Sequence, residues 1–374
     1  MSTRTPRLDW PDPIKGLAIT GVVVYHIALL LYRTPPFDHP KDDWPPLAER
    51  LAQMQPLAND STVAFALINA FRYLGWLGYQ GVGMFVLLSG FGLAWSAARA
   101  PMNAGSFYRR RLWRLLPMYW AAHAVFVGMN ALTGQPELSL TDSRFYLSLL
   151  TLRVTPDTWF YISPAWWYVW LMVQLYLAFP LLWRWLQRFG PKHFLAGTLL
   201  LTLFSRFVTL QLLATNAEMW SMGVLAVTRL VEFTAGMGLA YAWAQRPDPV
   251  ESLLRRGWVW LVAAFVYAVG LACSFTVSGQ IVAPVLLTLG GSLLVYRLAR
   301  AVRPISWLGW LGRESYPVML LHQPLLWWFI PQALALAPSF LTFWALLAGF
   351  ILVVVAGSVG LGKLVDRLAF RVVG

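Results

Sequence analysis

The chain has 374 residues, of which 58% are hydrophobic and only 12% are charged. Soluble domains carry roughly 25% charged residues, so this composition predicts a polytopic membrane protein. A single cysteine, Cys273, excludes a disulfide framework and a cysteine-rich metal site. The net charge of +13 would by itself be compatible with nucleic-acid binding. The cations are, however, distributed as in a membrane protein, so no nucleic-acid partner is expected.

Ten apolar stretches are long enough to cross a bilayer, since a spanning helix needs about 20 mostly apolar residues. They cover residues 13–32, 76–97, 112–133, 162–186, 194–214, 220–244, 258–276, 279–298, 314–334 and 340–364. With the N-terminus in the cytoplasm, most of the 29 Lys and Arg residues fall on the cytoplasmic side, as the positive-inside rule requires. We therefore expect an all-α polytopic protein of the cell membrane, with about ten transmembrane helices and both termini in the cytoplasm.

The expected domain organisation is one membrane domain over residues 1–374. It includes a long extracytoplasmic loop at 33–75, where the proline pairs at 35–36 and 45–46 oppose regular helix. No internal repeat is visible.

The first span places a lysine and a histidine on one face. Lys15 and His26 are eleven helical steps apart, which is three turns plus about 20°, with a rise of roughly 16 Å. Asp12, three residues before Lys15, can pair with it. Imidazole accepts a proton near neutral pH, so His26 is a candidate general base. A packing histidine beside a snorkelling lysine is the alternative.

Small residues dominate the second span, from Gly81 to Gly92. Such residues usually permit close helix packing. The functional alternative is that Ser89 and Gly90, followed by Phe91, allow a substrate to approach closely.

The third span begins with an arginine cluster, Arg110, Arg111 and Arg114. Arginines at this position mark the cytoplasmic end of a span. Arg111 and Arg114 are three residues apart and project from one face, and a guanidinium binds phosphate bidentately. The cluster would therefore also suit a cofactor with several phosphates.

Charged and titratable residues recur in two later spans. In the sixth span, Arg229 and Glu232 lie three residues apart, either as an ion pair or with the carboxylate orienting a catalytic histidine or holding an acceptor. In the ninth span, Ser315 and Tyr316 precede His322, which lies at a depth comparable to that of His26. The two histidines could therefore share one intramembrane pocket.

These motifs, in this order, resemble those of the acyltransferase-3 family of integral-membrane acyltransferases, over essentially the whole chain. The resemblance rests on Asp12, Lys15 and His26; on the glycine-rich strip ending in Ser89, Gly90 and Phe91; on Phe107, Arg110, Arg111, Arg114 and Pro117; on Glu232, Phe233 and Gly236; and on 311–322 with Ser315, Tyr316 and His322. One stretch departs from the pattern, because Met172 and Val173 stand where many members carry two acidic residues. This departure suggests a different acceptor or branch.

The resemblance implies transfer of an acyl group, usually acetyl, from cytoplasmic acetyl-CoA to a hydroxyl of a carbohydrate, glycolipid or glycosylated small molecule. Acetyl-CoA would be a donor substrate, with no permanently bound cofactor and no metal. Catalysis would involve His26, Glu232 and His322, while Lys15, Arg110, Arg111 and Arg114 would bind the CoA phosphates. Asp12, Ser89, Gly90, Phe91, Ser315 and Tyr316 would serve substrate contacts or packing. Direct attack and a transient acyl-histidine remain open.

The rival function from another class is a proton-coupled transporter or flippase of a lipid-linked or glycosylated substrate. Transporters often show twofold repeats with helices broken at matching positions, and the chain shows none.

Overall fold

The computed structural model of the chain describes residues 8–32, 46, 48–49, 52, 70–71, 73–133, 140–213, 217–301, 306–337 and 339–373. Most of the loop expected at 33–75 lies outside these residues. Within them the protein is helical, and no strand occurs. The expected all-α class is therefore confirmed for the described part of the chain.

The helices follow one another with short connections. The longer ones are α1 (Pro11–Tyr32), α4 (Gly81–Ala97), α5 (Ala104–Thr133), α8 (Trp167–Phe207), α10 (Leu230–Gln245), α12 (Gly257–Cys273), α13 (Ala283–Ala301), α15 (Ser315–Leu336) and α16 (Phe340–Val373). The shorter ones are η1 (Leu77–Gln80), α6 (Ser143–Leu149), α7 (Pro156–Trp159), η2 (Pro164–Trp166), η3 (Val208–Leu213), α9 (Ala217–Met222), η4 (Ala226–Arg229), α11 (Pro247–Arg255), η5 (Gly279–Ile281) and α14 (Ser306–Arg313).

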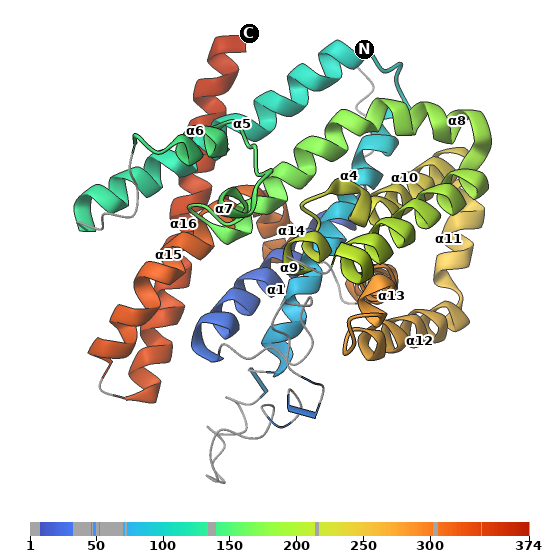
Figure 1. Cartoon of the computed structure of the whole chain (residues 1–374). Helices are drawn as coiled ribbons and strands as arrows, with labels where there is room; N and C mark the ends of the chain where they lie inside the picture. Colours follow the sequence, from blue (N-terminus) through green and yellow to red (C-terminus); the bar gives the residue numbers. More distant parts are fainter. Residues whose placement is uncertain are drawn as a thin grey trace.

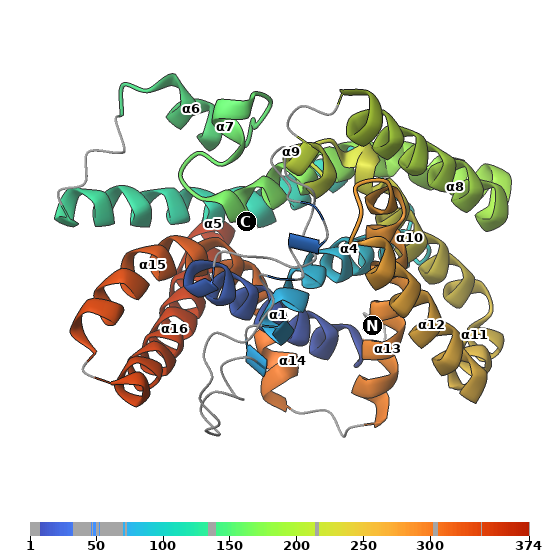
Figure 2. The same cartoon turned by 60° about the horizontal axis from the view of Figure 1, so that its bottom comes forward.

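Helices α1 and α4 lie in the middle of the molecule, between two flanks (Figures 1 and 2). Helices α15 and α16 pack together on one flank, and α12 and α13 pack together on the other. Helix α1 packs against α4, α14 and α15, while α4 packs against α10. Residues near both ends of the chain are thus brought to the same central helices.

Glycines set the spacing between α4 and α10. A Cβ atom added at Gly90 would collide with the backbone carbonyl of Phe233, and one added at Gly236 would collide with the carbonyl of Leu87. The two backbones therefore approach each other more closely than larger residues allow. Within the run of small residues in the second expected span, Gly90 therefore has a packing role.

Five helical stretches among the described residues are long and apolar enough to cross a membrane: Pro11–Leu31, Tyr73–Ala97, Ala104–Thr133, Pro164–Leu213 and Leu341–Ala369. A sixth candidate is the pair α11 and α12, which is bent by 71°. These helices make the chain a multi-pass membrane protein. The count of about ten spans and the orientation of the termini remain predictions.

Two glycines with positive φ break helical structure, one inside α8 and the other inside a span that was expected to be a single helix. Gly190, at φ 74° and ψ 167°, divides α8 into two arms, and it lies between the spans expected at 162–186 and 194–214. Gly223, at φ 115°, ends α9 within the span expected at 220–244. That span is therefore not one continuous helix, because only glycine adopts this conformation readily and the chain restarts at η4 and α10.

Candidate active site

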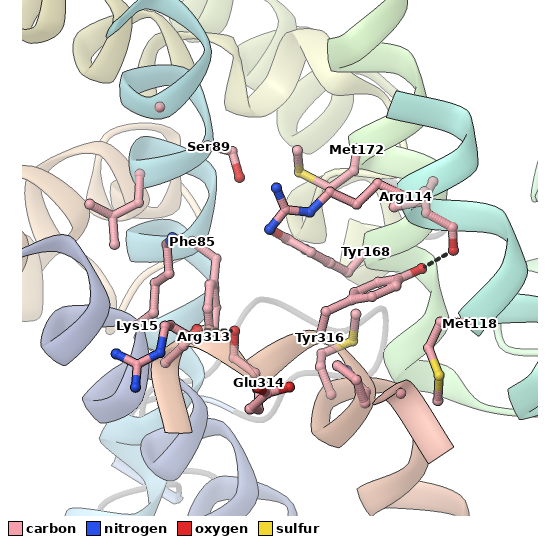
Figure 3. A pocket seen from close by; sticks show the side chains of 18 of the residues that line it. Lys15, Phe85, Ser89, Arg114, Met118, Tyr168, Met172, Arg313, Glu314 and Tyr316 are labelled. Atoms are coloured by element: carbon pink, nitrogen blue, oxygen red, sulfur yellow. Dashed lines mark hydrogen bonds between the residues drawn. The ribbon is translucent and has the colours of Figure 1, made fainter. Parts of the chain in front are cut away.

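The structure contains two cavities that are relevant to function. The first has a volume of about 370 Å³ and lies between α1, α4, α5, α8, α14, α15 and α16; we call it the basic cavity. Its lining includes four cations, Lys15, Arg111, Arg114 and Arg313, and two carboxylates, Glu314 and Asp366. Lys15 and Arg313 approach it from one side and Arg114 from the other (Figure 3). The surplus of positive charge suits a ligand that carries several negative charges.

Lys15 is held by the aspartate that the sequence pairs with it. Its Nζ lies 3.6 Å from Asp12 Oδ1, and Arg313 Nη1 lies 4.0 Å from Asp12 Oδ2. Asp12 is therefore a positioning group between two cations of the basic cavity. Its carboxylate does not line the cavity in the described residues.

Helix α5 presents two of its three predicted arginines to the basic cavity. Arg111 is half-buried, with its guanidinium carbon 5.7 Å from the ring centre of Phe107, and Arg114 follows one turn later. Helical periodicity places Arg114 near both Arg110 and Arg111, since residues three and four apart share a helix face. Arg110 is exposed and does not line the cavity. The structure thus separates it from the other two.

The Ser-Gly-Phe motif of α4 divides into a cavity residue and two packing residues. Ser89 lines the basic cavity, and Gly90 makes the close contact with α10 described above. The buried Phe91 ring packs edge-on against Trp10, with ring centres 4.9 Å apart.

The start of α15 closes the same cavity. Ser315 and Tyr316 both line the basic cavity, and each hydroxyl also donates a hydrogen bond to a backbone carbonyl. Ser315 Oγ donates to the carbonyl of Gly312 at 2.9 Å, and Tyr316 Oη donates to the carbonyl of Leu115 at 2.8 Å, the bond drawn in Figure 3. The Tyr316 bond ties α15 to the arginine-bearing helix α5.

The two histidines meet, although 296 residues separate them in the sequence. His322 Nε2 lies 3.0 Å from His26 Nδ1, and the ring centres are 4.9 Å apart. His322 is buried, and His26 is partly buried. The two histidines that were expected at similar depths are therefore in direct contact, although His322 does not line the cavity that His26 lines.

The backbone sets the tautomer of each ring. His322 Nδ1 lies 2.9 Å from the carbonyl of Val318, and His26 Nδ1 lies 2.9 Å from the carbonyl of Val22. Because a carbonyl oxygen only accepts, both Nδ1 atoms carry the proton in these bonds. His26 Nδ1–H then also donates to the unprotonated Nε2 of His322. In the neutral pair, Nε2 of His26 is the basic nitrogen.

His26 lines a second cavity, of about 220 Å³, which we call the histidine cavity. Its other lining residues are aromatic (Tyr25, Tyr79, Phe160, Trp167, Trp327), amide or hydroxyl (Gln80, Gln280, Gln323, Thr288), aliphatic (Val22, Leu29, Val82, Met222, Pro164, Pro284, Leu287) and one cation, Arg229. Helices α1, α4, α8 and α15 line both cavities. The basic and histidine cavities are thus built on the same four helices.

Glu232 contacts Arg229 rather than a histidine. Arg229 Nε donates to Glu232 Oε2 at 2.9 Å, and Nη2 donates to Oε1 at 3.2 Å. The carboxylate side chain is fully buried, and it does not line the histidine cavity in the described residues. The predicted catalytic role of Glu232 would therefore act through Arg229.

The sequence offered no signal for several residues of the histidine cavity. Gln323 Oε1 accepts from the backbone N–H of Ala165 at 2.6 Å and from Ser163 Oγ at 3.2 Å. These bonds fix the segment that carries Phe160 and Pro164 over the cavity. A glutamine beside a histidine in an apolar span gives no pattern from which this role could be predicted.

A third histidine, His123, has the structural role that a lone histidine in a span commonly has. It is buried, its Nδ1 lies 2.9 Å from the carbonyl of Tyr119, and its Nε2 lies 3.0 Å from Ser148 Oγ. It lines neither of the two cavities.

Taken together, these features define a multi-pass helical membrane protein with a cationic cavity beside a cavity that holds a basic imidazole, an arrangement suited to group transfer. A family model described as an acyltransferase domain, that of the acyltransferase-3 family, matches residues 8–362. The chain belongs to the acyltransferase-3 family and is a membrane acyltransferase. No curated protein and no solved structure matches the chain.

Proposed function

We propose that this protein is an O-acyltransferase that moves an acyl group, acetyl in the first instance, from cytoplasmic acyl-CoA to a hydroxyl of a carbohydrate, glycolipid or glycosylated small molecule in the cell membrane. One observation carries the proposal: the basic cavity, lined by Lys15, Arg111 and Arg114, shares four helices with the histidine cavity, which is lined by His26, the contact partner of His322. Family membership favours this reaction over proton-coupled transport.

The basic cavity suits the donor. Coenzyme A carries its phosphates at one end and its thioester at the other, and guanidinium groups bind phosphates through paired N–H donors. Lys15 and His26 are separated by about 16 Å along α1. Phosphates held at Lys15, Arg111 and Arg114 would leave the thioester arm to extend between the shared helices toward His26.

The histidine cavity suits the acceptor. Its volume of about 220 Å³ is below the roughly 300 Å³ typical of sites for drug-sized ligands, so it would hold the reacting end of a larger acceptor. Its aromatic rings offer apolar faces, and Gln80, Gln280 and Gln323 offer amide groups that pair with hydroxyls. This combination supports a polar, ring-shaped acceptor.

In the proposed reaction, the acceptor hydroxyl oxygen attacks the thioester carbonyl while Nε2 of His26 takes the hydroxyl proton. The tetrahedral intermediate then collapses, the carbon–sulfur bond breaks, and the departing thiolate receives that proton. The products are an ester and free CoA. His322 accepts from Nδ1–H of His26, so it would hold the reactive tautomer and stabilise the imidazolium that forms.

The test is acyl transfer from radiolabelled acetyl-CoA by the purified full-length protein in lipid nanodiscs, with octyl glycosides of several sugars as acceptors. We expect labelled ester and free CoA. His26→Ala should lower the rate by about 100-fold or more, since general base catalysis contributes about 10²–10⁴. His322→Gln should lower it less, because the amide oxygen can still accept from His26.

The matched control is His193→Ala, because His193 is exposed, lines neither cavity, and has its Nδ1 3.1 Å from the backbone carbonyl of Phe189. It should leave the rate unchanged. Full turnover by His26→Ala would refute the general-base role. Absence of transfer from acetyl-CoA to every acceptor, with uptake of a glycoside driven by a proton gradient instead, would refute the proposed reaction.

A further inference from the structure

The histidine cavity contains a single Lys or Arg among its described lining residues, Arg229. This arginine ends η4 and immediately precedes α10. Arg229 therefore lies at the junction of two helical segments and lines the same small cavity as His26.

Three hydrogen bonds fix the guanidinium. Two go to Glu232, as described, and Nη1 donates to the backbone carbonyl of Met222 at 3.1 Å. A guanidinium has five N–H groups, so one N–H on each Nη atom remains for another acceptor. The group is rigidly placed, yet it retains donors for a ligand.

The surrounding chain is shaped around the arginine stem. A Cβ atom added at Gly223 would lie too close to Cδ and Cγ of Arg229, and Gly223 has φ 115°. The break in the sixth expected span thus makes room for Arg229.

The two side chains of the ion pair differ in their access to the cavity. The Glu232 side chain is 0% exposed, whereas the Arg229 side chain is 10% exposed and lines the cavity. The Glu232 carboxylate therefore binds the guanidinium on the side away from the cavity, while Arg229 itself lines the cavity.

From this geometry we propose that Arg229 is a catalytic residue that donates hydrogen bonds to the acyl carbonyl oxygen as it becomes an oxyanion, and that Glu232 is its positioning residue. The proposal rests on the proposed acyl transfer. As the acceptor oxygen bonds to the carbonyl carbon, the carbonyl π electrons move onto oxygen. Arg229 stabilises that negative charge until the carbon–sulfur bond breaks and the C=O bond reforms. It remains protonated throughout, so the proton balance of the reaction is unchanged.

The pair with Glu232 also predicts which kinetic constant Arg229 affects. Because the neighbouring carboxylate balances its charge, Arg229 has little excess attraction for a neutral acceptor in the ground state. Its contribution arises when negative charge develops on the carbonyl oxygen, so its loss should lower kcat more than it raises KM.

The experiment compares Arg229→Gln, Arg229→Lys and Glu232→Gln in nanodiscs, with acetyl-CoA and the octyl glycoside that the wild-type protein uses best. Removal of one oxyanion donor typically costs about 10²–10³ in kcat, so we expect this loss for Arg229→Gln. The acceptor KM and the acetyl-CoA Kd should stay unchanged. Arg229→Lys should retain more activity than Arg229→Gln, because lysine keeps the positive charge, although it lacks the paired N–H donors of a guanidinium.

A second donor separates a catalytic from a structural role. Fluoroacetyl-CoA has a more electrophilic carbonyl and depends less on oxyanion stabilisation, so it should rescue Arg229→Gln relative to the wild type. A merely misfolded variant would not be rescued. Arg255→Gln is the control, because Arg255 pairs with Glu251 at an exposed site. Should Arg229→Gln fail to fold, Arg229→Lys gives the same comparison.

Unchanged kcat in the Arg229 variants would overturn the inference, as would a rise in acceptor KM at constant kcat. Equal losses with both donors would overturn it as well. None of these results would contradict the proposed function, because the acyl-transfer reaction is refuted only if the wild-type protein transfers no acyl group from acetyl-CoA to any acceptor.

Discussion

Arginines of one helix differ in what their side chains can reach. On α5, Arg111 and Arg114 line the basic cavity, whereas Arg109 and Arg110 are exposed and do not. A positive-inside signal needs only the charge, but a phosphate site needs a guanidinium that faces the cavity. The two functions of this cluster can therefore be separated by position along one turn of helix.

Arg111→Gln should weaken acetyl-CoA binding, while Arg109→Gln should not. A hydrogen bond to a charged group contributes about 1.5–3 kcal/mol, so we expect Kd to rise by about 10- to 100-fold. Calorimetric titration of the nanodisc protein with acetyl-CoA measures this change. Equal Kd values for the two variants would show that the cluster serves topology alone.

The sequence allowed some of these residue positions to be predicted. The shared face of Lys15 and His26, the pairing of Lys15 with Asp12, and the common face of Arg111 and Arg114 all follow from helical periodicity. The contact between His26 and His322 and the place of Arg229 in the histidine cavity depend on packing between distant helices. No local sequence pattern specifies packing between distant helices. The similar expected depth of the two histidines was the one feature that indicated their contact.

Helix α4 shows how an element serves both packing and the site. One face carries Phe85 and Ser89 into the basic cavity, and another face lets Gly90 pack against the backbone of α10. Helix α10 in turn begins next to Arg229. The spacing between α4 and α10 therefore affects both cavities.

Gly90→Ala and Gly236→Ala should each destabilise the fold, because the added methyl group collides with a backbone carbonyl that cannot move independently. Overpacking typically costs about 1–3 kcal/mol. The expected result is a lower melting temperature in detergent, measured by intrinsic tryptophan fluorescence.

Gly128→Ala is the control for these variants, since a Cβ atom at Gly128 on α5 meets open space. It should leave the melting temperature unchanged or raise it slightly, because alanine favours helix. If Gly90→Ala kept its melting temperature but lost acetyl-CoA binding, Gly90 would instead belong to the substrate site.

Element positions were predictable where long apolar stretches determine them, and less so where single residues break a helix. The expected spans 13–32 and 76–97 match α1 and the η1–α4 pair closely. The break at Gly223 was missed, because one glycine in an apolar stretch looks the same whether it packs in αR or adopts positive φ. Helix α5 begins at Ala104, before the expected residue 112, since its arginines continue the helix beyond the apolar segment.

At the scale of the whole molecule, α8 decides how the chain is threaded through the membrane. The apolar stretch Pro164–Leu213 has 50 residues, about twice the length that one crossing needs. The break at Gly190 allows its two arms to cross separately. With two crossings, three spans separate residues 141 and 252, which places these residues on opposite faces, whereas a single crossing would place them on the same face.

Thr141→Cys and Ser252→Cys, each introduced singly with Cys273→Ser, test this threading. Both positions are exposed, and Cys273 is the protein's one native thiol, so labelling reports only the new residue. A membrane-impermeant maleimide should label Thr141→Cys in intact cells and Ser252→Cys only after permeabilisation, because the basic connections favour the cytoplasm. The Cys273→Ser protein, which has no cysteine, sets the background under the same conditions. Labelling of both new thiols in intact cells, or of neither, would assign α8 one crossing and contradict the ten-span topology. The predicted pattern would instead place the end of α1 that carries Lys15 on the cytoplasmic side, where acyl-CoA is available to the basic cavity.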